Sequence, residues 1–231
     1  MRGSGRFTIV PIVEGHGEVE AVPALLNRWF LHRRYTNFGT PREATRGQKG
    51  ALSAPYDPDR ENGIELFIRR AAAKRPDGIL VILDADDDCH AASGRPPHEQ
   101  LGPRLLSRAV AEARHIPIGV VVANREFEAW FLAGFHRLRS RVPFHWQADC
   151  IDPSQSEVPR DCKGRISRRL GQEYSPTVHQ KELVRHLGFG SYMTRHSRSF
   201  RKLLSVLESM TKDARRNHRT RIRQQRRSGA V

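Results

Sequence analysis

The sequence predicts an α/β fold, in which a parallel sheet is flanked by helices and followed by a basic, helical C-terminal extension. Short, β-branched apolar runs alternate with stretches of helical periodicity, which is the pattern of a parallel sheet covered on both faces. Of the 231 residues, 38% are hydrophobic, which is enough for a packed core. No apolar run reaches the ~20 residues that span a bilayer, so we expect no membrane-spanning segment.

The first unit is a strand, a tight turn and a helix. Residues 7–13 (FTIVPIV) are typical of a buried strand, although Pro11 lacks an N–H and favours an edge position or an irregular strand end. Residues 14–18 (EGHGE) form the turn. Within residues 19–34, apolar side chains recur with helical spacing, at positions 22, 25, 26, 29 and 30.

The middle of the chain continues the alternation after a polar interruption. Residues 35–62 are rich in glycine and proline, so we expect one weak strand and a long loop there. After them, helices and buried strands follow one another. They are a helix at 63–74, the strand GILVIL at 78–83, a helix at 99–114, a strand at 116–122 and a helix that begins near residue 125.

The C-terminal part has weaker periodicity, with helical stretches near 179–187 and 196–213. The last residues, 213–229, are almost pure arginine, histidine and glutamine and lack the apolar side chains that a core needs. We therefore divide the chain into three regions. They are a sheet domain (6–140), a basic, mostly helical region (141–212) and a basic, disordered tail (213–231).

Positive charge is concentrated at the C-terminal end. Residues 160–231 contain 19 Lys and Arg against 5 Asp and Glu, a net of +14, whereas residues 1–159 contain 21 against 20, a net of +1. Such a surface favours a polyanion, most simply DNA or RNA, as partner. The alternative is a solvated tail that aids solubility or subunit docking.

The three cysteines and the N-terminus indicate where the protein works. Cys89, Cys150 and Cys162 are too few for a disulfide scaffold, and no signal-peptide pattern precedes the first apolar run. We therefore expect a cytoplasmic protein. Since the cysteines form no Cys-x-x-Cys pattern, zinc is disfavoured.

Acidic side chains follow three of the predicted strands. In open α/β sheets, functional groups gather at the carboxyl ends of the strands. Carboxylates that meet at one sheet edge repel one another unless a cation neutralises them, so the pattern indicates metal binding. The three sets are Glu14 and Glu18, then Asp84, Asp86 and Asp88, and finally Glu126 and Glu128.

The spacing of these acids sharpens the prediction. Asp84 and Asp86 in extended backbone would point the same way, and Gly15 and Gly17 would let the first turn bring its two glutamates together. Hard oxygen ligands suit one or two Mg²⁺ or Mn²⁺ ions, and two ions ~3.5–4 Å apart would polarise a phosphodiester. An ordinary acidic turn, with first-turn charges favoured by the helix dipole, remains the alternative for each set taken alone.

The same segments resemble a known domain. The residues VEGxxE at 13–18 and LDAD at 83–86 resemble the TOPRIM domain of topoisomerases, primases and overcoming-lysogenisation-defect (OLD) nucleases. REFEAWF at 125–131 and YSPT at 174–177 are similar to a family of stand-alone, TOPRIM-like bacterial proteins of unassigned function, typically encoded beside AAA-type ATPases. The resemblance covers residues 6–205.

The resemblance implies a Mg²⁺-dependent nuclease fold. Glu14 would then serve as general acid or base and Glu18 as the second glutamate of the OLD-type pattern, while Asp84 and Asp86 hold metal, with Asp88 as a further contact. Glu128 matches the glutamate of the later helix, and Glu126 is the second candidate for this position. This sequence departs from the family in carrying Asp87 and Asp88 where many members have glycine or a small residue, which leaves the ligating set open. The chain has no P-loop, so an ATPase partner would be a separate chain.

Several cations could act on the phosphate. Lys163, Lys181 and Arg125 are candidates for stabilising negative charge in the transition state, with Lys163 the one we assign. His16 could orient substrate or be a plain exposed turn residue. The backbone contacts that we expect with nucleic acid come from Arg165, Arg168, Arg169, Lys181, Arg198, Arg201 and Lys202.

The function that the sequence favours is divalent-metal-dependent cleavage of DNA or RNA, as the effector of a defence or repair system with an AAA-type ATPase. One alternative is a catalytically inactive docking subunit of such an ATPase complex. Another is a small-molecule phosphatase, disfavoured because the haloacid dehalogenase type places its Asp-x-Asp after the first strand. A homo-oligomer remains open.

Overall fold

The computed structural model describes residues 7–86, 97–143, 152–157 and 161–228, of which 97–100 and 221–228 are described by their backbone alone. Its centre is a parallel sheet with the strand order β2-β1-β4-β5, and β3 also pairs with β1. The strands are β1 (Phe7–Val13), β2 (Phe38–Gly39), β3 (Thr45–Arg46), β4 (Gly78–Asp84) and β5 (Ile118–Ala123).

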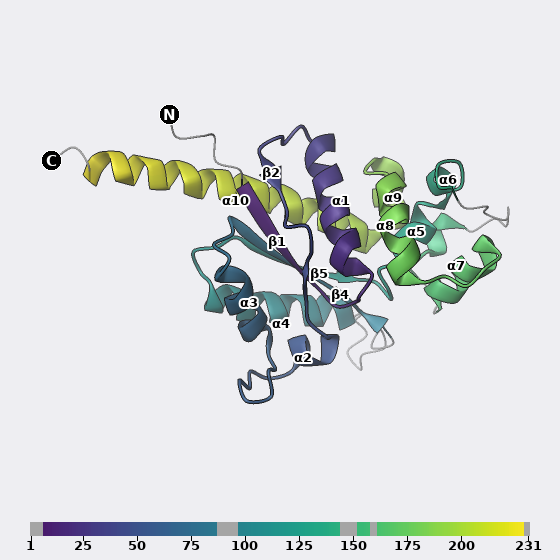
Figure 1. Ribbon diagram of the computed structural model, residues 1–231, viewed down its shortest axis with the longest axis horizontal. Helices are drawn as coiled ribbons and strands as arrows, with labels where there is room; N and C mark the ends of the chain where they lie inside the picture. Colours follow the sequence, from purple (N-terminus) through teal and green to yellow (C-terminus); the bar gives the residue numbers. More distant parts are fainter. Residues whose placement is uncertain (1–6, 87–96, 144–151, 158–160, 229–231) are drawn as a thin grey trace.

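Helices cover both faces of the sheet (Figure 1). Helices α3 and α4 pack on one face, α1 and α10 pack on the other, and α5 to α9 gather beside the carboxyl ends of the strands. The helices are α1 (Glu18–His32), α2 (Lys49–Ser53), α3 (Ile64–Ala72), α4 (Pro97–Glu112), α5 (Ala129–Ala133), α6 (Phe135–Leu138), the short 3₁₀ helix η2 (Pro153–Gln155), α7 (Cys162–Leu170), α8 (Pro176–His186), α9 (Ser191–His196) and α10 (Arg198–Ser228).

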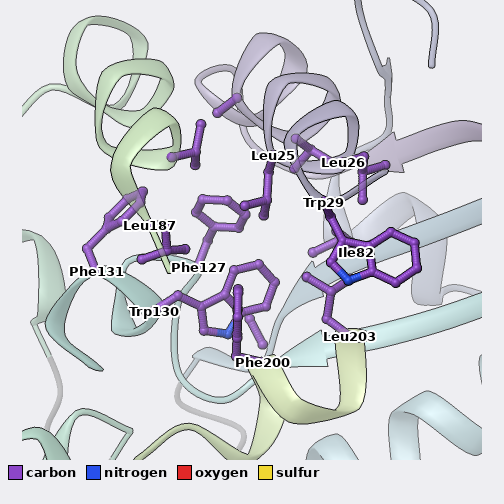
Figure 2. Packing of buried hydrophobic residues seen from close by; sticks show 14 of the residues in the cluster. Leu25, Leu26, Trp29, Ile82, Phe127, Trp130, Phe131, Leu187, Phe200 and Leu203 are labelled. Carbon is purple, nitrogen blue, oxygen red and sulfur yellow. The ribbon is translucent and has the colours of Figure 1, made fainter. Parts of the chain in front are cut away.

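The alternation of side chains along the strands produces two cores. On β4, Leu80 and Ile82 face α1 and α10, whereas Val81 faces α3 and α4. The first core continues from the sheet into the C-terminal helices, where the rings of Trp130 and Phe200 meet edge to face (Figure 2). The helices of the C-terminal region therefore share the core of the sheet.

The prediction that Pro11 marks an edge position or an irregular strand end is wrong, because Pro11 lies within the continuous strand β1. Strand β1 lies inside the sheet, with β4 on one side and both short strands on the other. On that second side, β2 pairs with Phe7 and Thr8, and β3 pairs with Ile12 and Val13. Pro11 lies in the gap between these two pairings, where a missing N–H costs no bond to either short strand.

Residues 213–228 are helical, which corrects the expectation of a disordered tail. They form the second half of α10, which runs on beyond the sheet (Figure 1). Met210 and Ala214 are buried, and the guanidinium of Arg215 lies over the rings of Tyr35 and Phe38 at 4.5 and 5.3 Å from their centroids. These contacts hold a stretch of the helix that is too polar to form a core by itself.

Three smaller differences concern element boundaries. The segment expected to hold one weak strand contains β2, β3 and α2. The helix expected from residue 125 begins at Ala129, because Arg125 adopts a left-handed φ of 67° and residues 124–128 form a turn. Helix α7 was not anticipated from the sequence.

Helices that combine the length and the apolar character required to cross a bilayer are not found among the described residues.

Candidate functional site

Acidic side chains from the ends of three strands lie at the carboxyl edge of the sheet. Glu14 follows β1, Asp84 is the last residue of β4, and Glu128 ends the turn that follows β5. Glu18, at the start of α1, joins them. Glu18, Asp84 and Glu128 are 3%, 7% and 1% exposed, which is unusual for carboxylates and calls for compensating partners.

The two glycines of the first turn are required by close packing. A Cβ on Gly15 would lie 2.8 Å from Oε1 of Glu18, whose pKa is lowered by the nearby backbone of Gly15 and Glu14 although burial raises it more. A Cβ on Gly17 would lie 2.6 Å from the backbone of Pro176 and 2.5 Å from Oε1 of Gln180, both on α8. The absence of side chains at these two positions of the turn therefore lets the buried carboxylate of Glu18 pack against Gly15 and helix α8 pack against Gly17.

Hydrogen bonds join the acids that follow different strands. The backbone N–H of Asp84 donates to Oε2 of Glu14 over 3.3 Å. Oδ1 of Asp84 accepts from the backbone N–H of Phe127 over 2.8 Å, in the turn after β5. The three strand ends are thus tied together through Asp84.

Glu128 is held by two residues of the C-terminal region. Its Oε1 accepts from the hydroxyl of Tyr174 and from Nε2 of Gln180, each at 3.0 Å. Sequence reasoning did not assign these residues a role, although the motif YSPT includes Tyr174. Burial and the charge of Glu128 raise the pKa of Tyr174 well above its usual value, so the phenol stays protonated and continues to donate.

The acids raise one another's pKa values. Burial, followed by the charge of Glu128, raises the pKa of Glu18 to about 7. Burial and the charges of Glu18 and Glu128 raise the pKa of Asp84 well above its ordinary value. Burial also raises the pKa values of Glu14 and Glu126. The cluster therefore resists carrying its full negative charge without a cation.

Lys163 is a basic side chain beside this cluster. Its Nζ lies 3.8 Å from Oε2 of Glu126 and 4.0 Å from Oε2 of Glu128. Desolvation works against its charge, but the carboxylates of Glu128, Glu126 and Asp84 outweigh this and raise its pKa. Lys163 therefore remains an ammonium.

The donor set fits a hard divalent cation in its chemistry. Oε2 atoms of Glu18, Glu126 and Glu128 are buried without a hydrogen-bond partner, and every donor is a carboxylate oxygen. Among the described residues, however, no three His, Cys, Asp or Glu side chains are placed together as metal ligands. Binding of a cation would therefore draw these side chains closer together.

The prediction that Asp86 points with Asp84 is wrong. The strand ends at Asp84, and Asp86 has a left-handed φ of 51° that turns its side chain out of register. Its half-exposed carboxylate forms an ion pair with Nζ of Lys49 at 2.9 Å. Its charge still raises the pKa of Glu14, so it lies near the cluster. Asp88 lies outside the described residues.

The other predicted cations are spread over several elements. Lys181 pairs with Glu20 on α1 at 2.6 Å and not with the acidic cluster. The backbone carbonyl of Arg125 accepts from the N–H of Asp86 at 2.7 Å, and its Nη1 is buried without a hydrogen-bond partner. His16 is exposed in the first turn.

The cations expected to contact nucleic acid lie mainly on two helices. Arg165, Arg168 and Arg169 are on α7, which also carries Lys163. Some of them have partners within the chain, such as Arg168 with Asp161 at 3.5 Å. Their contact with nucleic acid stays a prediction. Of the other four, Lys181 is on α8, and Arg198, Arg201 and Lys202 lie in the first two turns of α10.

The fold and the site together define an α/β protein with a buried carboxylate cluster at the carboxyl edge of a parallel sheet. Residues 13–208 match the family described as "Domain of unknown function (DUF4276)", and the chain belongs to this family. A comparison with curated proteins found no match.

Two solved structures are similar to the chain at a distance. The C-terminal region of the Burkholderia pseudomallei OLD protein has 17% sequence identity and a TM-score of 0.40, with 92% of this chain and 100% of that chain covered. For the C-terminal region of the Xanthomonas campestris pv. campestris OLD protein, the identity is 11% and the TM-score 0.38, with 93% and 98% covered. Similarity at this level carries no functional argument.

Proposed function

We propose that this protein is a divalent-metal-dependent nuclease that hydrolyses phosphodiester bonds of DNA or RNA. The observation that carries the proposal is the cluster of Glu14, Glu18, Asp84, Glu126 and Glu128, which follow three strand ends and raise one another's pKa values, with Glu18, Asp84 and Glu128 buried. A protein gains nothing for its stability from gathering like charges in this way. A cation that engages them would explain the arrangement.

The residues that would hold Mg²⁺ or Mn²⁺ are Glu14, Glu18, Asp84 and Glu128, with Asp86 and Glu126 at the margin. Bound there, a divalent ion would activate water and neutralise charge on the phosphate. Glu14 is half-buried and has a raised pKa, which suits it to accept the proton of the attacking water.

The neighbouring side chains would complete the site. Tyr174 and Gln180 fix the carboxylate of Glu128 through Oε1 and leave its Oε2 available. Lys163 carries a persistent positive charge beside Glu126 and Glu128, where it would meet a phosphate oxygen. The arginines of α7 would then contact the nucleic-acid backbone without selecting a sequence.

The setting that we propose is a cytoplasmic defence or repair system with a separate AAA-type ATPase. This part of the proposal depends on the motif resemblance alone. TOPRIM membership is likewise proposed, because the parallel sheet and the acids after β1 and β4 are compatible with it.

The test is cleavage of plasmid DNA and of RNA with Mg²⁺ or Mn²⁺. Asp84→Asn keeps an acceptor for the N–H of Phe127 but removes a charge, and Asp59→Asn makes the same change on an exposed loop. We expect the wild type and Asp59→Asn to cleave, and Asp84→Asn to lose about 100-fold or more in rate. Equal cleavage by Asp84→Asn would refute the proposed site.

A non-catalytic docking subunit is the second candidate. The observation in its favour is that cations of the chain already stand beside several acids, since Lys49 pairs with Asp86 and Lys163 lies beside Glu126 and Glu128. In that case the cluster would be neutralised internally and would not bind Mn²⁺. No cleavage by the wild type, with or without the ATPase present, would favour this candidate.

A further inference from the structure

Strand β5 forms an outer edge of the sheet. Among the described residues, β4 is its neighbour on one side and no strand pairs with its other side. Its sequence, IGVVVA at 118–123, contains no charge and no proline. Charges and prolines within the strand are two of the devices by which proteins protect such an edge from pairing with another chain, and β5 has neither. Val120 and Val122 are 5% and 6% exposed, so access to the edge depends on the space between the helices that flank it.

The backbone groups that face outward can be assigned from the pairing with β4. The carbonyls of Pro117 and Ala123 accept from N–H groups of β4 and of the residue after it, each at 2.9 Å. Backbone groups alternate sides along a strand, so the odd-numbered residues face β4. The N–H and C=O groups of Ile118, Val120 and Val122 therefore face away from the sheet, and no hydrogen bond from them to another element is found in the described part of the chain.

A groove runs along this edge between α4 and α10. It consists of two cavities of about 330 and 290 Å³ that share Leu106, Val120 and Lys202 in their walls. Gly119, also in its wall, is closely approached by α10: a Cβ there would lie 2.3 Å from Cγ1 of Val206. We call this feature the β5 groove.

The two walls of the β5 groove differ in chemistry. The α4 wall includes Pro103 and Leu106, which are apolar, whereas the α10 wall includes Ser199, Lys202 and Ser205. Lys202 is exposed. At the far end, Asp213 is paired with Arg216 at 2.9 Å. A strand laid along β5 would direct alternate side chains to the two walls.

We propose that the β5 groove binds an extended, acidic segment of a partner protein, which adds to the sheet as a further strand. Backbone pairing with Ile118, Val120 and Val122 would supply affinity, and alternating apolar and acidic side chains would match the two walls. Nucleic acid lacks the two-residue repeat of donors and acceptors that the edge presents. A second copy of the chain is disfavoured because each copy carries a net charge of +15.

The inference is independent of the proposed nuclease activity and is tested by binding alone. The probe is a fluorescein-labelled decapeptide of alternating valine and glutamate, and its lysine counterpart is the control. We expect saturable binding of the glutamate peptide, and we expect the affinity for the lysine peptide to be lower by about tenfold or more. Equal binding of both peptides, or of neither, would overturn the proposal.

Amide hydrogen exchange locates the bound peptide. In the free protein, the amides of Val120 and Val122 should exchange faster than those of Gly119 and Val121, and the glutamate peptide should slow them. Binding without this change would place the peptide elsewhere and contradict strand addition.

Charge reversal on α10 tests the basic wall. Lys202→Glu should lower the affinity for the glutamate peptide by about tenfold. Lys212→Glu makes the same change on the same helix but outside the groove, and it should leave this affinity within about twofold of the wild-type value. Equal losses in both variants would show attraction to net charge only and would refute a specific groove. Circular dichroism of both variants verifies that α10 is intact.

Discussion

At the scale of single residues, the acidic cluster combines strong desolvation with mutual repulsion. Glu18 illustrates the balance, because two backbone N–H groups favour its charged form while burial and the charge of Glu128 oppose it. The net result is a pKa of about 7, well above the ordinary 4.5. Glu18 therefore changes protonation near neutral pH, where a bound cation would compete with the proton.

The raised pKa of Glu18 predicts how stability depends on pH. The folded protein holds a proton on Glu18 that the unfolded chain loses above pH 4.5, so the metal-free protein should lose stability as the pH rises from about 4.5 to about 7. The loss due to this residue is on the order of 3 kcal/mol. Urea unfolding at pH 5 and pH 8 measures it.

Glu18→Gln is the matched variant for this measurement. It should remove the share of the pH dependence that comes from Glu18, leave the shares of Asp84, Glu14 and Glu126, and raise the stability of the metal-free protein at pH 8. If the wild type and Glu18→Gln lose the same free energy of unfolding between pH 5 and pH 8, Glu18 is not the group that titrates.

The gathering of Glu14, Asp84 and Glu128 could be predicted because each follows a strand of one parallel sheet, and the ends of such strands share an edge. The direction of Asp86 could not be predicted, since a single φ of 51° turns it toward Lys49. The hydrogen-bond partners of Glu128 could not be predicted either. Tyr174 and Gln180 lie 46 and 52 residues away, and no local pattern links such distant positions.

At the scale of elements, the first turn positions both the cluster and helix α8. Gly17→Ala would place a Cβ against the backbone of Pro176, so α8 would have to move away from α1. We expect this variant to lose about 1–3 kcal/mol of stability. Gly50→Ala is the control. Gly50 lies within α2, and a Cβ at this position would have no other heavy atom within 4 Å.

Thermal unfolding compares the two glycine variants. Gly50→Ala should be neutral or up to about 1 kcal/mol more stable than the wild type, since alanine favours helix. An equally neutral Gly17→Ala would contradict the close contact between the first turn and α8.

The elements that sequence patterns predicted well are those with strong periodicity, such as α3 and β4. The second half of α10 was missed for a physical reason. Its stability derives from Ala214 in the core and from Arg215 stacked on Tyr35 and Phe38, which are contacts with the far end of the chain. Local composition cannot reveal such contacts.

At the scale of the whole molecule, charge is divided between a buried acidic site and basic helices. Helix α10 carries a basic surface formed by Lys212, Arg215, Arg216 and Arg219. Together with the cations of α7, it makes a polyanion the expected ligand. The same asymmetry allows nucleic acid along α7 and the second half of α10, and an acidic peptide at the β5 groove, where it would compete with the nucleic acid expected at Arg198 and Lys202.

Salt dependence tests the contribution of α10 to nucleic-acid binding. If Lys212 and Arg219 contact phosphates, changing both to alanine should reduce the slope of log affinity against log salt concentration by about 2. The control changes Arg60 and Arg104 to alanine, in the loop before α3 and on α4. Equal slopes for the two double variants would place the nucleic acid away from this part of α10.

The most direct test of the account is calorimetric titration of the metal-free protein with Mn²⁺ at pH 7. We predict saturable binding, with proton release seen as a dependence of the heat on the buffer, because Glu18 and Asp84 must lose their protons. Asp84→Asn should abolish this binding, and Tyr174→Phe should weaken it by about tenfold. The absence of saturable binding to the wild type would contradict a metal site in the acidic cluster.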